Sequence, residues 1–254
     1  MSKKKFYLKK LQSIGEITVW LVDGNRIRRQ LDMDFTNFGQ HFVFPFIPED
    51  EFWLDPEALV LKEKDFFLTH LLVEWEMMKQ GYDYITATNA ADQKERVDRA
   101  KAGDLKKVLK KDGEIDLKKI HQRLLKRLPN GFKIWLVNGR LVRSAWDPEF
   151  TAGSHHQVDP YVPEDEIWID SAVSQAEKLF VILHELYEND LMIKEHLDYD
   201  PAHDRANAIE QRCRRNSKHL AGNLRKFGWV VSPEKSESVT SAIGLEPKEA
   251  EAVV

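Results

Sequence analysis

The sequence predicts an α+β protein of two tandem homologous domains, each a small antiparallel sheet followed by a helical hairpin. Three observations predict it: the chain repeats internally, each copy carries strand and turn signals early on, and each copy ends in long helical patterns. The 254 residues suffice for two ordinary domains. A hydrophobic content of 42% is enough for a packed core.

The internal repeat is the strongest of these signals. The stretch 17–28 is echoed by 132–143, so that Trp20 and Trp135 lie 115 residues apart. The same spacing aligns 45–55 with 160–170. A period this long indicates two copies of a domain rather than a solenoid. We expect the first copy to occupy 1–103, the second 104–228, and a disordered tail 229–254.

Each copy opens with a Lys-rich amphipathic segment, 3–13 in the first and 116–125 in the second. An apolar strand follows, and it ends at Asp23-Gly24 in the first copy or Asn138-Gly139 in the second. Because Asp-Gly and Asn-Gly are the dipeptides that two-residue hairpin turns favour, we expect a hairpin to turn at each position.

A third strand and two helices are expected to complete each copy. The third strand is expected at 51–55 and at 166–170, bounded by proline. Helical periodicity is expected over 57–80 and 86–100 in the first copy, and over 171–195 and 201–226 in the second. The joint at 101–113 is charged and has helical periodicity inside, which predicts a short connecting helix.

Composition narrows the class of protein. A net charge of -4 argues against a broad nucleic-acid-binding surface. The sequence has no run of eighteen apolar residues that would predict a membrane span. The single cysteine, Cys213, fits a reducing compartment, so we expect a cytoplasmic protein, in the host cytoplasm if a phage encodes it.

The chemistry-bearing residues gather in the second copy. His184 and Glu188 are four residues apart, which places both side chains on one face of a helix. His203 and Glu210 are about two turns apart on the next predicted helix and share a face as well. If the two helices form a hairpin, two imidazoles and two carboxylates converge, which is the ligand chemistry of a divalent metal such as zinc.

Comparison of the copies separates the shared residues from the changed ones. The shared pairs are His70 with His184, Glu74 with Glu188 and Glu95 with Glu210. The changed pairs are Leu71 with Glu185 and Thr88 with His203. The first copy therefore reads as a degenerate partner that keeps the scaffold but has lost a candidate base and a candidate ligand.

One interpretation makes His184, Glu188 and His203 the metal ligands. Glu185 is then the general base beside the metal, and Glu210 is either a fourth ligand or a carboxylate that orients His203. The other interpretation needs no metal, because a buried histidine hydrogen-bonded to carboxylates in both copies is also what a structural polar network looks like.

Other residues carry weaker signals. His155 and His156 supply two further imidazoles, and His156 aligns with His41. We expect a hydrogen-bonded loop histidine here; the alternative is a histidine that reaches the site as an oxyanion donor or a ligand. His196 has no counterpart and is expected to face solvent. The tryptophans recur at equivalent strand positions and are expected in the core: Trp20, Trp53, Trp135 and Trp168.

The second copy also carries a family resemblance. The pattern His184-Glu185-Leu186-x-Glu188, followed by Tyr199-x-x-Ala202-His203-x-x-Ala206-x-x-x-Glu210, resembles zincin-like metallopeptidase domains of uncharacterised phage and bacterial proteins. The strand 162–170 is similar to the strand before the active helix in those domains. Zincins use His-Glu-x-x-His, and here Glu188 replaces the second histidine.

The resemblance implies one zinc or another divalent metal per chain and hydrolysis of a peptide or amide bond. It names no particular peptide or protein as substrate or partner. The alternative is a non-catalytic phage or bacterial structural or interaction protein that keeps the zincin-like fold.

Overall fold

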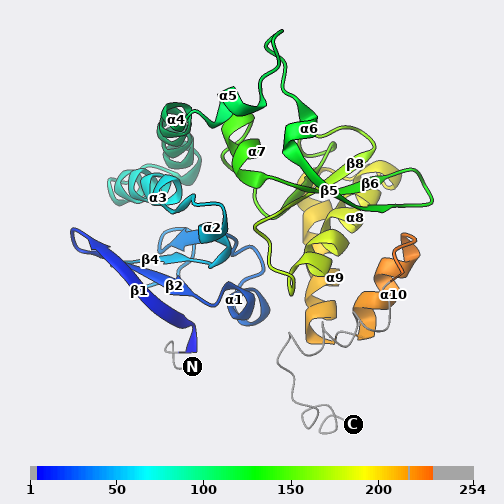
Figure 1. Ribbon diagram of the computed structural model, residues 1–254. Helices are drawn as coiled ribbons and strands as arrows, with labels where there is room; N and C mark the ends of the chain where they lie inside the picture. The colour runs from blue at the N-terminus through cyan, green and yellow to red at the C-terminus, as the bar shows by residue number, and fades with distance from the viewer. Residues whose placement is uncertain (1–4, 217, 231–254) are drawn as a thin grey trace, which may run out of the picture. The chain divides into compact units, whose positions relative to one another are not determined.

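The computed structural model describes residues 5–216 and 218–230 (Figure 1). It is an α+β structure with two four-stranded sheets. The chain divides into two compact units, one of residues 1–124, 135–154 and 168–173, the other of residues 125–134, 155–167 and 174–254. The predicted tail lies outside the described residues apart from 229–230. Every helix in the described part of the chain is too short or too polar to cross a lipid bilayer.

The first sheet is mixed, so the expectation of an antiparallel sheet was wrong. Its strands are β1 (Tyr7–Ile14), β2 (Ile17–Val22), β3 (Phe38–Gln40) and β4 (Glu51–Leu54), in the order β1-β2-β4-β3. β1 and β2 pair antiparallel, as do β3 and β4, whereas β2 and β4 run parallel. A parallel pair needs a long crossover, and the chain between β2 and β4 supplies one.

The hairpin predicted at Asp23-Gly24 was also wrong, because helix α1 (Gly24–Gln30) begins there. The Asp23 side chain accepts a hydrogen bond from the Arg26 amide at 2.9 Å. Aspartate is a preferred N-cap as well as a turn residue, so the same dipeptide can start a helix. The hairpin of this copy forms instead between β1 and β2, one strand earlier.

The second copy repeats this arrangement at Asn138-Gly139. Helix α7 (Gly139–Ala145) starts there, with the Asn138 side chain accepting from the Leu141 amide at 3.2 Å. Gly139 is required for space rather than for a positive φ, because a Cβ there would lie 1.9 Å from Asp170 Oδ2. That carboxylate accepts a hydrogen bond from Nη1 of Arg143, which lies 2.8 Å away. Both side chains are buried.

The second sheet has the same strand order as the first. Its strands are β5 (His121–Arg127), β6 (Lys133–Val137), β7 (Gly153–His155) and β8 (Glu166–Asp170), in the order β5-β6-β8-β7. The strands predicted at 51–55 and 166–170 are confirmed as β4 and β8. The Lys-rich segment at 116–125 forms the short helix α6 (Leu117–Ile120) and the start of β5.

Each copy ends in a helical hairpin, as predicted, but the helices expected at 57–80 and 201–226 are each divided in two, the one expected at 171–195 is shorter, and the one expected at 86–100 is longer. In the first copy they are α2 (Glu57–Val60), α3 (Lys64–Lys79) and α4 (Tyr84–Ala102), followed by the connecting helix α5 (Asp104–Val108). In the second copy they are α8 (Lys178–Lys194), α9 (Tyr199–Arg215) and α10 (Lys218–Lys226). α3 packs on α4, and α8 packs on α9. Lys62, with a φ of 58°, separates α2 from α3.

The tryptophan prediction was half right. Trp53 and Trp168 are fully buried, whereas Trp20 and Trp135 are only partly buried. Trp20 and Trp53 are register partners on β2 and β4, so neighbours in one sheet differ in depth.

Candidate metal centre

Two helices of the second unit supply the candidate ligands. His184 and Glu188 lie one turn apart on α8, and His203 lies on α9, which packs against it. The apolar residues of α8 anchor the helix by burial and leave the histidine and the glutamate on a common face. The convergence predicted from the four-residue and hairpin spacings is therefore present.

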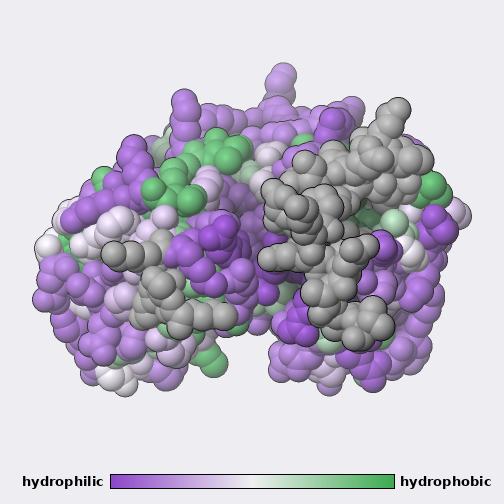
Figure 2. All heavy atoms as spheres, turned by 90° about the horizontal axis from the view of Figure 1, so that it is seen from below, coloured by the Kyte–Doolittle hydropathy of each residue, from purple (hydrophilic) through white to green (hydrophobic). Residues whose placement is uncertain are grey.

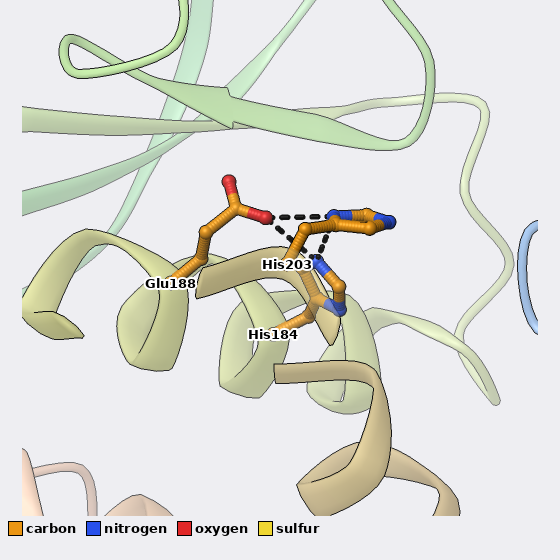
Figure 3. Close-up of side chains that lie close together, drawn as sticks. All are labelled: His184, Glu188 and His203. Atoms are coloured by element: carbon orange, nitrogen blue, oxygen red, sulfur yellow. Dashed lines mark hydrogen bonds and ion pairs between the residues drawn. The ribbon is translucent and has the colours of Figure 1, made fainter. Parts of the chain in front are cut away.

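The three side chains meet at one point (Figure 3). Glu188 Oε2 lies 2.7 Å from His203 Nδ1 and 3.3 Å from His184 Nε2, and the two imidazole nitrogens are 3.2 Å apart. Glu188 is buried, whereas the His203 side chain remains 28% exposed, so solvent reaches the group from the α9 side.

This geometry fits a divalent cation. Ligand atoms about 2.1 Å from a tetrahedral zinc are separated by roughly 3.4 Å, close to the two longer separations here. A single proton bridges only one pair of these atoms at a time, whereas a cation takes lone pairs from all three. Two nitrogens and a carboxylate oxygen are also the donor types that zinc binds.

Glu210 lies beside His184 rather than beside His203. Its Oε2 is 3.0 Å from His184 Nδ1, on the side of the ring opposite Nε2. Its Oε1 accepts from Arg214 Nε at 2.7 Å, and Arg214 also bonds both oxygens of Glu177. The carboxylate thus fixes the orientation of His184, a role that partners of metal-binding histidines commonly have.

Glu185, the candidate base, is buried and directly follows the first ligand. Its carboxylate offers an oxygen within 4.8 Å of donor atoms of His155 and Glu188. Burial, together with the neighbouring charge of Glu188, raises the pKa of Glu185 to about 8.

The pKa values of the two carboxylates that contact His184 are lowered instead. Burial by itself would raise the pKa of Glu188, but hydrogen bonds from His155, His184 and His203 hold it well below its usual range. Burial opposes the ionised form of Glu210 as well, yet the charge of Arg214 and the hydrogen bond with His184 lower its pKa to about 2. For His184, the hydrogen bonds with Glu188 and Glu210 outweigh burial and raise the pKa to about 10.

His155 contacts the site, which is the less favoured of the two alternatives for the histidines at 155 and 156. It is completely buried at the end of β7, and its Nε2 lies 3.1 Å from Glu188 Oε1. The repeat contained the signal, because Gln40 occupies the equivalent position and donates from Nε2 to Glu74 Oε1 at 2.8 Å. The first copy has a glutamine and the second a histidine at this position, in both cases beside the glutamate that the two copies share. This difference singles out His155.

The first copy retains the polar framework of the centre. His70 Nδ1 lies 3.1 Å from Glu95 Oε2, and Arg99 Nε donates to the other oxygen of Glu95 at 2.7 Å. His70 and Asp92 of the first copy and Glu149 of the second, all in one compact unit, also bring potential ligand atoms within 4.8 Å of one another. The Glu149 side chain is 43% exposed, in contrast to the buried Glu188.

The weaker candidates are structural. His156 Nδ1 lies 2.7 Å from the Val162 carbonyl, and His41 Nδ1 lies 3.1 Å from that of Ile47, so both rings brace a loop as expected. His196 is exposed. Cys213 is buried and accepts from Asn223, and burial raises the pKa of its thiol.

The fold and the site define an α+β protein with two imidazoles and a carboxylate gathered between two packed helices. Models of known protein families, curated proteins and solved structures give no match to this chain.

Proposed function

We propose that the chain is a zincin-like, metal-dependent hydrolase that cleaves a peptide or amide bond in the second copy. His184, Glu188 and His203 hold one zinc or another divalent cation, and Glu185 is the general base. The observation that supports this proposal best is the convergence of His184 Nε2, His203 Nδ1 and Glu188 Oε2 within 3.3 Å of one another.

The cation, Glu185 and Glu210 have different roles in the proposed reaction. A bound divalent cation supplies Lewis-acid chemistry, which lowers the pKa of water towards about 7 and polarises a carbonyl. Glu185 takes a proton from the attacking water and returns it to the leaving amine. Glu210, held by Arg214, keeps His184 turned so that its Nε2 faces the other two ligands.

The rival is an interaction protein that keeps the fold without catalysis. Such a protein would be expected to present a large contiguous apolar surface. The described residues on the face in Figure 2 are mostly hydrophilic, with hydrophobic residues in small patches. Exposed large hydrophobic residues are spread along the chain, Leu8, Val60, Ile85 and Val158 among them. The described residues on this face therefore offer small apolar patches rather than one large docking surface.

The test is hydrolysis of a mixed peptide library by the zinc-loaded chain, with products read by mass spectrometry. We expect cleavage that disappears in Glu185→Gln and after removal of metal by a chelator, and that returns when zinc is added back. Cleavage that survives both treatments would refute the proposed centre. A folded, zinc-containing chain that cleaves no peptide or amide in the library would favour the rival.

A further inference from the structure

The two carboxylate oxygens of Glu188 face different groups. Oε2 belongs with His184 Nε2 and His203 Nδ1, as described above. The other oxygen points away from these two imidazoles (Figure 3). It lies 3.1 Å from Nε2 of His155, which comes from the end of β7 rather than from either helix.

On this second side there is another set of potential ligands. His155, Glu185 and Glu188 each offer one donor atom, and all three atoms lie within 4.8 Å of one another. The exposed fractions of the three residues are 0%, 8% and 3%. An imidazole nitrogen with two carboxylate oxygens is again a donor set that zinc and similar cations take.

The charges on this side favour a cation. Two buried carboxylates side by side repel each other when both are ionised, and either a proton on one of them or a cation between them removes the repulsion. The hydrogen bonds recorded for Glu188 come from imidazoles. Arg214, a buried guanidinium of the same unit, is already held by Glu177 and Glu210.

The repeat gives an independent observation. Around the glutamate shared by both copies, the first copy has Gln40 and Leu71, whereas the second has His155 and Glu185. Neither a glutamine amide nor a leucine is a usual zinc ligand. The second copy therefore differs at two positions, on a strand and on a helix, and both differences add a ligating group next to Glu188.

We propose that the centre has a second divalent-cation position, held by His155, Glu185 and Glu188, with Glu188 bridging the two cations. This rests on the proposed function for the first position. A carboxylate bridge of this kind is typical of two-metal sites. When Glu185 serves as a ligand it is no longer free to accept a proton, so occupation of the second position suppresses hydrolysis.

The experiment is calorimetric titration of the metal-free full chain with zinc alone. Each variant replaces a residue of the second copy by the residue that the first copy has at the equivalent position. His155→Gln preserves a donor to Glu188, as Gln40 does for Glu74, but removes the ligand. Glu185→Leu removes the carboxylate, and His203→Thr removes a ligand of the first position only. Circular dichroism and urea unfolding verify that each variant folds.

We expect two zinc equivalents for the wild type, with the weaker one absent in His155→Gln and in Glu185→Leu and retained in His203→Thr. A single equivalent in the wild type, or two equivalents in His155→Gln, would overturn the second position. The latter result would show that His155 only orients Glu188. Binding of two equivalents, together with no peptide cleavage by the chain loaded with a single equivalent, would leave this inference standing and refute the hydrolase.

Discussion

Glu210 Oε2 lies 3.0 Å from His184 Nδ1, so this carboxylate contacts the ring nitrogen that does not face the other candidate ligands. Arg214 in turn fixes the other oxygen of Glu210. The ring of His184 cannot rotate without breaking a buried, charge-assisted hydrogen bond, and its Nε2 stays directed at Glu188. The precision of the centre therefore depends on a residue that need not touch a metal.

Replacement of Glu210 by glutamine should weaken zinc binding. The amide is nearly the same size but is a weaker acceptor, so we expect a loss of about 10- to 100-fold in affinity with the fold intact. Competition with a chromogenic chelator measures it. Glu95→Gln, the equivalent change in the first copy, is the matched control and should leave the affinity unchanged; an equal loss in both variants would contradict the assignment.

Replacement of Glu185 by glutamine should separate catalysis from binding at the first position. The amide cannot accept the proton of water, so we expect hydrolysis to fall by about 100-fold or more. The tightly bound zinc equivalent should remain, because its ligands are His184, Glu188 and His203. Loss of that equivalent, measured by elemental analysis, would make Glu185 a ligand of the first cation and refute its role as base.

Gly139→Ala should destabilise the chain. Its Cβ would lie 1.9 Å from Asp170 Oδ2, and the carboxylate must then move away from Arg143. Overpacking of this kind costs about 1–3 kcal/mol, measurable by urea unfolding. Gly222→Ala is the control, because its added Cβ meets nothing within 4 Å and alanine favours a helix interior. Equal stability for the two variants would contradict this view of Gly139.

The first copy should give a pH-dependent contribution to stability through His70. Burial lowers its pKa, but hydrogen bonds with Glu74 and Glu95 outweigh this effect and raise the pKa to about 10 from an ordinary value of 6.5. The stabilisation is therefore complete below pH 6.5 and is lost as the pH rises towards 10.

Urea unfolding of the wild type and of His70→Gln measures this effect. The difference in free energy of unfolding should be largest near pH 6 and should shrink as the pH is raised to about 10. The lowered pKa of Glu95, caused by His70 and Arg99 against the effect of burial, adds stability above its ordinary pKa of 4.5. A constant difference between pH 6 and pH 10 would show that His70 is not charged in the folded chain.

The sequence predicts those parts that depend on spacing along one element. His184 and Glu188 share a face because they are one helical turn apart, and the repeat alone places strands β4 and β8. The start of α1 was misread because Asp23-Gly24 has the residue types of both a turn and an N-cap.

Pairings between distant elements were harder to predict. The role of Glu210 depends on the rotation of α9 against α8, which decides whether the carboxylate meets His184 or His203. His155 reaches Glu188 from a strand, and spacing within a helix cannot show such a contact. Its place in the segment before the strand at 166–170 allowed a role at the site, and its alignment with Gln40 carried the more specific signal.

The central claim is a metal held in the second copy by His184, Glu188 and His203, of which His203 has no equivalent ligand in the first copy. The most direct measurement is elemental analysis of the untagged chain after dialysis against metal-free buffer, for the wild type, His184→Ala and His70→Ala. Because dialysis removes the cation of the weaker second position, we expect about one tightly bound equivalent of zinc or another divalent metal in the wild type and in His70→Ala, and none in His184→Ala. Absence of metal from the wild type, or its retention in His184→Ala, would contradict the account.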